Sequence, residues 1–368
     1  MLDTETVVIG AGPAGLATAT CLRHAGRPFL LLEQSAAVGQ AWRNHYDRLH
    51  LHTSKRLSQL PGLAFPRRVP RYPARTQVIE YLEAYARNFE LAPRFGERVV
   101  SVRREGSTWL TRSEREAFRS SNVVVATGFA HVPVRPSWPG LSSFAGQVLH
   151  SSEYRNGAPW RGGRVLVVGI GNSGGEIALD LFECGAHPTL SVRSGVNVVP
   201  RDFLGVPILA WGIALGHMPL GLADAIASGV SRVAIGRLEP LGLHRPPYGP
   251  MRQIGSTGHI PLLDIGTVAS IRRGEIAVRG GVEAFTREGA RFVGRAAAEP
   301  FDAVVLATGY RPGLAAFLEA PEALGADEVP RGGALPGLYF CGFHVVATGM
   351  LREIAIEARQ IAGEIARA

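Results

Sequence analysis

Two stretches of the chain share one pattern of apolar and glycine positions. In each, a run of Val, Ile and Leu without alternating polar residues leads through a glycine-rich turn into a helix-like segment, at residues 6–26 and 165–186. Apolar runs of this kind are typical of strands that are buried on both faces of a parallel sheet. A similar run ends in Ala-Thr-Gly downstream of each unit, at residues 123–128 and 304–309. The pattern predicts an α/β fold with two Rossmann-like dinucleotide-binding domains.

The first glycine-rich turn reads Gly10-Ala11-Gly12-Pro13-Ala14-Gly15. Its first glycine permits a sharp turn, its second lets the backbone approach a pyrophosphate, and its third lets the helix pack on the strand. Glu33 lies 18 residues after Gly15, at the end of the next apolar run. A carboxylate there accepts hydrogen bonds from ribose hydroxyls and would repel a 2′-phosphate. The turn therefore predicts an FAD site that includes Glu33 and its neighbour Gln34.

The second glycine-rich turn reads Gly169-Ile170-Gly171-Asn172-Ser173-Gly174. The strand expected after it, at residues 189–192, ends in Arg193-Ser194, so an arginine replaces the ribose-binding acid. A guanidinium forms charge-assisted, bidentate hydrogen bonds with phosphate. This site is therefore predicted to bind NADPH in preference to NADH, and Arg201 is a weaker second candidate for the same task.

The length and the linker composition predict how the two domains are connected. A chain of 368 residues exceeds the size of roughly 250 residues at which single cores stop growing. Residues 131–164 are rich in Pro, Gly and Ser, which is typical of a connection between domains. We expect the NADPH domain to be inserted in the FAD domain. The expected boundaries are residues 1–155 and 290–368 for the FAD domain and residues 156–289 for the NADPH domain.

Charge and histidine spacing exclude two other classes of function. The net charge is +8, but the chain has no block of basic residues and no RNA-binding aromatic signature, so nucleic acid is not an expected partner. A positive field suits phosphate-rich cofactors and an acidic substrate. His45, His50 and His52 lack metal-ligand spacing and accompanying carboxylates or thiols, so no metal site is expected.

The three cysteines and the N-terminus indicate a reducing compartment. Cys21, Cys184 and Cys341 form no C-x-x-C motif and are odd in number, which argues against a disulfide framework or a dithiol redox centre. The N-terminus carries two acids and leads directly into a strand, so we expect no signal peptide and a cytoplasmic location.

Residues 203–223 are strongly apolar and have about the length of a membrane span. Pro207, His217 and Pro219 interrupt the stretch, so a spanning helix is not expected. The sequence leaves open whether the segment lines a substrate cavity or touches a membrane surface.

A stretch from Phe144 to Tyr154, FAGQVLHSSEY, fits the pattern FxGxxxHxxxY/F. Further ordered motifs are Gln40-Ala41-Trp42, Tyr46-Asp47-Arg48-Leu49, YLEAY at 81–85, Ala126-Thr127-Gly128, Val192-Arg193-Ser194, LDIG at 263–266, ATGYR at 307–311 and YFCGF at 339–343. With the two glycine-rich turns, these motifs resemble the flavin-containing monooxygenases over almost the whole chain. The closest resemblance is to the plant YUCCA-type branch, which converts indole-3-pyruvate to indole-3-acetic acid.

The resemblance implies an oxidoreductase that uses FAD, NADPH and O2. It implies a monooxygenase acting through a C4a-(hydro)peroxyflavin, with an aryl 2-oxo acid such as indole-3-pyruvate as the substrate of an oxidative decarboxylation. Two alternatives stay open: N- or S-oxygenation of a small amine or sulfide, and an NADPH oxidase or reductase that does not oxygenate a substrate. Disulfide-reductase relatives need a cysteine pair that this chain lacks. The oligomeric state stays open.

The resemblance also assigns candidate site residues. His52 stands where many family members carry Asn and the YUCCA branch carries His, so His52 and Thr53 are the candidate catalytic residues; a packing role for His52 stays open. A helix beginning near Met350 would direct its positive end at the flavin. Residues 343–352 differ from the plant pattern, which leaves the substrate in doubt. The other implied cofactor contacts are Gln40, Trp42, Leu49, His50, Val99, Ala126, Thr127, Gly128, Ala307, Thr308, Gly309, Gly342, Thr348 and Gly349.

Overall fold

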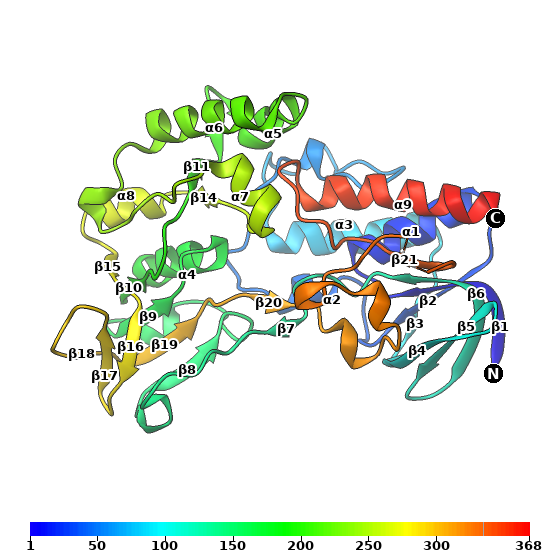
Figure 1. Cartoon of the computed structure of the whole chain (residues 1–368), viewed down its shortest axis with the longest axis horizontal. Coiled ribbons are helices and arrows are strands. Elements are labelled where there is room, and N and C mark those ends of the chain that lie inside the picture. The colour runs from blue at the N-terminus through cyan, green and yellow to red at the C-terminus, as the bar shows by residue number, and fades with distance from the viewer. Residues whose placement is uncertain (334) are drawn as a thin grey trace.

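The computed structural model describes residues 1–333 and 335–368, which form two α/β units side by side (Figure 1). The first unit is built on a sheet of strand order β3-β2-β1-β6-β5-β4, with β21 also paired to β6. Strands β1, β2, β3, β6 and β21 are parallel, and β4, β5 and β6 form an antiparallel meander. The bounds are β1 (Leu2–Ile9), β2 (Phe29–Glu33), β3 (Arg94–Phe95), β4 (Val99–Glu105), β5 (Thr108–Ser113), β6 (Ala117–Val125) and β21 (Leu338–Phe340).

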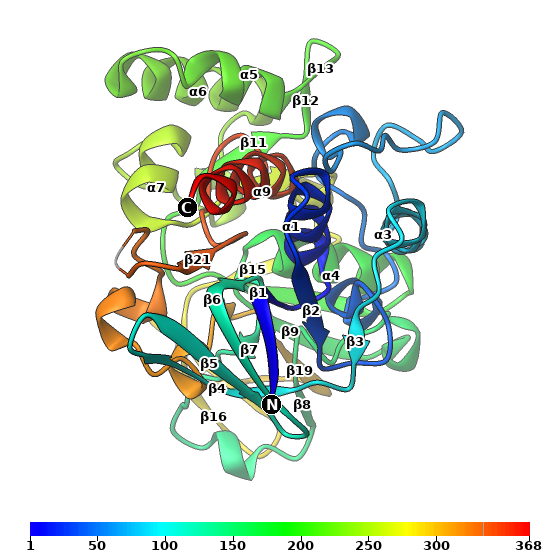
Figure 2. The ribbon, with the colours of Figure 1, turned by 90° about the vertical axis from the view of Figure 1, so that its right-hand side faces the viewer.

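Both faces of this first sheet are buried, as its apolar runs predict. Val8 lies in a core shared with three helices, α1 (Pro13–His24), α3 (Arg75–Asn88) and α9 (Met350–Arg367). Its neighbours Val7 and Ile9 point to the opposite face, where they join a second core with Leu314. Figure 2 shows α1 and α9 packed side by side above the sheet. Alternate side chains of one strand thus serve two cores, which explains the absence of polar alternation.

The second unit is built on a parallel sheet of order β15-β10-β9-β19-β8. Helices α4 and α8 pack on one face, and a small antiparallel sheet of β16, β17 and β18 packs on the other. The bounds are β8 (Gln147–His150), β9 (Arg164–Val168), β10 (His187–Ser191), β15 (Ala277–Arg279), β19 (Ala303–Leu306), β16 (Val282–Phe285), β17 (Gly289–Phe292), β18 (Glu299–Pro300), α4 (Asn172–Glu183) and α8 (Thr267–Arg272). The expected fold class, with two Rossmann-like units, is confirmed.

The boundaries expected at residues 155 and 290 stay a prediction, and the sheets show only how the strands near them pair. Strand β8 and the segment from β17 to β19 were expected in the first domain, but β8 and β19 pair within the second sheet. The chain crosses between the units where β7 (Val132–Pro133) pairs with β20 (Tyr310–Arg311). The apolar run of β19 resembles those of the first sheet, and a run alone does not identify the strand with which it pairs.

Outside the second sheet, a helical layer continues the second unit (Figure 1). It contains β11 (Val198–Pro200) paired with β14 (Leu262–Asp264), the hairpin of β12 (Asp202–Phe203) and β13 (Val206–Pro207), α5 (Ile208–Leu215), α6 (Leu220–Ile235) and α7 (Pro250–Thr257). The apolar stretch 203–223 is therefore divided, because Pro207 and Pro219 each immediately precede a helix. No helix among the described residues combines the length and apolar character needed to cross a membrane.

Candidate functional site

The two glycine-rich turns have the same backbone geometry. Gly10 and Gly169 have φ angles of 105° and 108°, a region that favours glycine. A Cβ on Gly10 would lie 2.6 Å from the carbonyl oxygen of Ala126, and one on Gly169 would lie 2.5 Å from that of Ala307. Each turn therefore passes directly over the residue that follows a neighbouring strand.

The third glycine of each motif allows its helix to pack against the turn. A Cβ on Gly15 would lie 1.7 Å from the carbonyl oxygen of Gly10, and one on Gly174 would lie 2.1 Å from that of Gly169. Distances this short exclude any side chain at either position. Close packing of helix on strand is the function that the fingerprint gives to its third glycine.

The second glycine of each motif faces open space. A Cβ on Gly12 or on Gly171 would meet no protein atom within 4 Å. Each is the residue preceding its helix, and neither α1 nor α4 has a side chain that caps its first turn. Pro13 follows Gly12 and has no N–H of its own. Two uncapped helix N-termini with open space beside them fit the pyrophosphates of two dinucleotides.

Glu33 closes the first turn at the carboxyl end of β2. Its Oε2 accepts a hydrogen bond from the backbone N–H of Ala11 at 2.7 Å, and its Oε1 accepts one from that of Ser35 at 2.9 Å. The carboxylate is thus oriented at the turn, where it suits a ribose diol. The neighbouring Gln34 is exposed.

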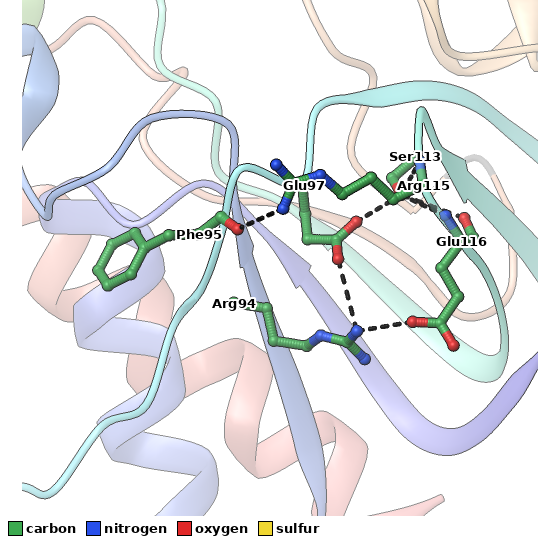
Figure 3. Close-up of polar contacts among 6 residues, drawn as sticks. All are labelled: Arg94, Phe95, Glu97, Ser113, Arg115 and Glu116. Carbon is green, nitrogen blue, oxygen red and sulfur yellow. Dashed lines mark hydrogen bonds and ion pairs between the residues drawn. The ribbon is translucent and has the colours of Figure 1, made fainter.

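A polar cluster supports the strand beside Glu33 (Figure 3). The backbone N–H of Glu97 donates to the carbonyl oxygen of Glu33 at 2.9 Å. The Glu97 carboxylate is buried and accepts a hydrogen bond from Ser113, while Arg94 bridges it to Glu116 at 3.4 and 2.6 Å. Strand β4 begins at Val99 directly after this cluster, so the cluster fixes the backbone beside Glu33 where β4 starts.

Residues 126–128 follow β6 and border the first turn. The N–H of Ala126 donates to the carbonyl oxygen of Ile9 at 2.9 Å, which holds the two strand ends together. The hydroxyl of Thr127 is buried without a hydrogen-bond partner among the described residues. Gly128 has a φ angle of 87°, and a Cβ there would meet open space. An orphaned buried hydroxyl beside open space fits a bound polar ligand, so the residues present fit FAD.

The second turn has an arginine where the first has Glu33. Arg193 and Ser194 follow β10 and are exposed, and among the described residues the Arg193 guanidinium has no hydrogen-bond or ion-pair partner. The stem of Arg193 lies against Gly281, where a Cβ would be 3.3 Å from Cγ. A free guanidinium at this strand end fits a 2′-phosphate.

Two other residues predicted as cofactor contacts around the second turn form hydrogen bonds within the protein. The side-chain oxygen of Asn172 accepts from the N–H of Leu263 at 2.8 Å. The hydroxyl of Thr308 donates to the carbonyl oxygen of Val134 at 2.5 Å. Ala307 and Gly309 lie beside the second turn, as Ala126 and Gly128 lie beside the first. Ser173 lies in the first turn of α4.

The segment from α2 (Gln40–Asn44) to residue 61 lies between the two units. Trp42 packs against the cores of both units, and Leu49 is buried in the core of the second. Gln40 donates to Asn44 at 3.0 Å, and the Nδ1 of His50 lies 2.6 Å from the carbonyl oxygen of Arg48. This segment therefore follows strands of the first unit along the chain, but it packs against the core of the second unit as well.

A cavity of about 260 Å³ opens between the units. Its walls come from the segment after α2, from α4 and from the loops after β11 and β14; its lining residues are Arg48, His50, Leu51, His52, Glu176, Arg201 and Ile265. The Nε2 of His52 lies 2.8 Å from an Oε of Glu176, whose side chain is 2% exposed. We did not predict Glu176 from the sequence. The signal that could have identified it was a carboxylate two residues after Gly174, within the predicted helix that follows the glycine-rich turn.

Burial shifts the pKa values of two ionisable side chains near Glu176. Burial raises the pKa of Tyr46 well above its usual range, and the nearby Glu176 carboxylate adds to the effect. Burial also lowers the pKa of His45, with Arg155 and Arg75 acting in the same direction and Glu176 opposing them. Burial therefore favours a neutral Tyr46 and a neutral His45.

The N-terminus of α9 reaches the same region. Gly349 precedes α9 with a φ angle of 97°, and a Cβ there would lie 3.2 Å from Cγ2 of Thr53 and 2.6 Å from Cδ2 of Leu209. Thr53 shares a hydrogen bond of 2.5 Å with Ser58. The structure thus brings Thr53, the start of α9 and helix α5 together, so the apolar stretch 203–223 contributes Leu209 to this region.

Two further predicted contacts have partners within the α9 region. The hydroxyl of Thr348 donates to Glu353, and the N–H of Gly342 donates to an Oε of Glu357 at 2.7 Å. Both bonds join the segment before α9 to the helix itself. Backbone groups rather than the Thr348 hydroxyl are therefore available for a ligand at this end of the helix.

Comparison with known proteins agrees with this geometry. Residues 7–201 match the model of the pyridine nucleotide-disulphide oxidoreductase family. The chain is 39% identical to the probable indole-3-pyruvate monooxygenase YUCCA1 of Arabidopsis thaliana, over 98% of this chain and 89% of that protein. It is 40% identical to the indole-3-pyruvate monooxygenase YUCCA1 of Oryza sativa subsp. japonica, over 92% of this chain and 86% of that protein.

A solved structure shows the same fold. The flavin-containing monooxygenase from Stenotrophomonas maltophilia superposes with a TM-score of 0.78 at 24% identity, over 100% of this chain and 99% of that one. The likeness therefore includes both units and the chain crossings between them.

Proposed function

The chain belongs to the flavin-containing monooxygenases, within the wider pyridine nucleotide-disulphide oxidoreductase family, and on that premise we propose that it uses FAD and NADPH to oxygenate an aryl 2-oxo acid such as indole-3-pyruvate. One observation carries the proposal. Two turns of the same geometry differ in the residue at the carboxyl end of the next strand, which is Glu33 as the last residue of β2 and Arg193 just beyond β10. An acid suits a ribose diol and an arginine suits a 2′-phosphate.

The assignment of cofactors follows from these two residues. FAD would lie on the turn at Gly12, with its ribose at Glu33, and NADPH would lie on the turn at Gly171, with its 2′-phosphate at Arg193. When bound, the flavin supplies hydride acceptance and the activation of O2. The chain's own residues orient both dinucleotides and shield the reacting region from water.

The cavity between the units supports the choice of an acidic substrate. Arg48 and Arg201 both line it, and Arg48 is already paired with Glu183. Arg201 stacks on the ring of Tyr72 at 4.3 Å, and its buried Nε has no hydrogen-bond partner among the described residues. The same Nε lies 3.7 Å from a carboxylate oxygen of Asp202, so stacking and an ion pair both hold Arg201 in place. An arginine fixed in this way is suited to bind a carboxylate through its other N–H groups.

Of the two candidate catalytic residues, we propose that His52 acts on the reacting groups and that Thr53 holds the backbone beside it. His52 lines the cavity, and Thr53 lies beside the start of α9, whose backbone N–H groups and positive end favour an anionic ring. His52 would hydrogen-bond the oxygenating group and control its proton. Thr53 would fix the local backbone through its bond to Ser58.

A substrate panel tests the proposal directly. The FAD-loaded protein is supplied with NADPH, O2 and one of four compounds: indole-3-pyruvate, phenylpyruvate, a tertiary amine or a thioether. The proposal expects the decarboxylated acid from one or both oxo acids. Products only from the amine or thioether would instead identify an N- or S-oxygenase.

Stopped-flow absorbance separates monooxygenation from simple electron transfer. The protein is reduced anaerobically with NADPH and mixed with oxygenated buffer without substrate. A long-lived near-ultraviolet absorbance is expected before the oxidised spectrum returns. Immediate reoxidation with stoichiometric hydrogen peroxide would identify an oxidase.

A further inference from the structure

Glu176 is a buried carboxylate that has no role in either of the two proposed dinucleotide sites. It lies in the second turn of α4, is 2% exposed and faces the cavity between the units. Among the described residues, no arginine or lysine lies within ion-pair distance of it. Burial of a carboxylate is strongly unfavourable without a compensating proton donor. Glu176 therefore needs a donor from outside its own helix.

That donor comes from the other unit. The Nε2 of His52 lies 2.8 Å from one carboxylate oxygen, at ion-pair distance but without the alignment of a full hydrogen bond. The hydroxyl of Tyr46 also faces this carboxylate, and His45 lies near it. Arg48 and Arg201 are the other charged groups on the cavity wall.

The contact distinguishes the two nitrogens of the His52 ring. A carboxylate facing Nε2 favours a proton on that nitrogen, whether the ring is neutral or charged. Nδ1 has no hydrogen-bond partner among the described residues. That nitrogen is buried, so the ring has a buried Nδ1 and an Nε2 that faces Glu176.

We propose that Glu176 is a positioning residue, which holds the ring of His52 through its contact with Nε2. His52 belongs to the segment after α2, and Glu176 belongs to α4 of the second unit. The contact forms only when the two units are packed as they are here. The orientation of His52 is therefore coupled to the packing of the second unit against the first.

The test uses the FAD-loaded full chain with Glu176→Gln and His52→Gln. Glu183→Gln is the matched control, because Glu183 lies on the same helix and forms a different ion pair across the units, with Arg48. The chain has 11 histidines, so nitrogen NMR of histidine-labelled protein assigns His52 by the signal lost in His52→Gln. In the wild type and in Glu183→Gln we expect a proton on Nε2. In Glu176→Gln we expect averaged signals from two exchanging tautomers.

Kinetics supply a second measurement. Anaerobic reduction of the flavin by NADPH should be unchanged in Glu176→Gln, while product formed per NADPH falls roughly tenfold, because His52 loses the contact that orients its ring. Equal losses in both steps would overturn the proposal, because Glu176 would then act on NADPH binding. An unchanged His52 signal in Glu176→Gln would overturn it as well.

The kinetic part rests on the proposed function, whereas the NMR part does not. If wild-type protein forms no product from any compound of the panel but the tautomer changes as expected, the proposed function fails and the positioning role stands. If Glu176→Gln forms product at the wild-type rate with an unchanged His52 signal, the positioning role fails and the proposed function stands.

Discussion

The imidazole Nε2 of His150 lies 3.1 Å from the carbonyl oxygen of Gly309. This contact joins the end of β8 to the turn after β19, next to the place where the chain crosses between the units. Nδ1 of the same ring lies 3.0 Å from the hydroxyl of Ser152, and the ring packs edge-on against Tyr310 at 5.0 Å. Both ring nitrogens of a fully buried histidine are thus used within the fold.

This environment predicts an acid-sensitive stability. Burial lowers the pKa of His150 below its ordinary value of 6.5, and Arg135 adds to the effect, against the Gly309 carbonyl and Glu153. Below pH 6.5 the unfolded chain takes up a proton at this position while the folded chain resists it. The contribution to stability is therefore present above pH 6.5 and lost as the pH falls toward the lowered value.

Calorimetry of His150→Gln measures this contribution. The variant should lose about 1–3 kcal/mol of stability at neutral pH, because it disturbs buried hydrogen bonds. Its unfolding temperature should also fall less steeply than that of the wild type below pH 6.5, although His45 contributes in the same direction. His187→Gln is the control, because His187 is exposed. Parallel pH profiles for the wild type and His150→Gln would contradict the assignment.

Arg193→Gln should change the preference between nicotinamide cofactors. Loss of a charge-assisted bond to a 2′-phosphate costs about 1.5–3 kcal/mol, which is roughly 10- to 150-fold in affinity. Anaerobic flavin reduction should need correspondingly more NADPH, with little change for NADH. Arg112→Gln, an exposed arginine on β5, should affect neither. An unchanged NADPH dependence in Arg193→Gln would remove the second turn from the proposed NADPH site.

The second glycines of the two turns allow a matched pair of variants. Gly12→Ala and Gly171→Ala add a Cβ where no protein atom lies within 4 Å, so both chains should fold. Gly12→Ala should bind FAD about 100-fold more weakly, or about 2.8 kcal/mol. Gly171→Ala should retain FAD and lose reduction by NADPH. Gly221→Ala, which also adds a Cβ to open space, is the control. Normal FAD content in Gly12→Ala would place the cofactor elsewhere.

The sequence predicted those parts of the molecule that depend on local patterns. The two sets of apolar runs and glycine-rich turns were sufficient to predict the two Rossmann-like units. Each turn needs a positive φ angle at its first glycine, Gly10 or Gly169, and that requirement is visible in the local sequence. It did not predict that β19 pairs with β9, since buried parallel strands have similar compositions. It also missed the contact between His52 and Glu176, which joins two units and has no local signature.

Because Cys21 and Cys341 are buried, we expect their thiols to be unreactive in the folded protein. Burial raises the pKa of Cys21 to about 11 and that of Cys341 to about 12. A thiol alkylates through its thiolate, so both should resist iodoacetamide at pH 8, whereas the partly exposed Cys184 should react.

Mass spectrometry of the labelled protein should find modification at Cys184 alone, and at all three cysteines after denaturation. Cys184→Ser should leave NADPH oxidation and product formation unchanged. Labelling of Cys21 or Cys341 in the folded protein at the rate of Cys184 would show that the packing around them opens readily. Loss of activity in Cys184→Ser would instead indicate thiol-dependent electron transfer, as in the disulfide reductases that share this fold.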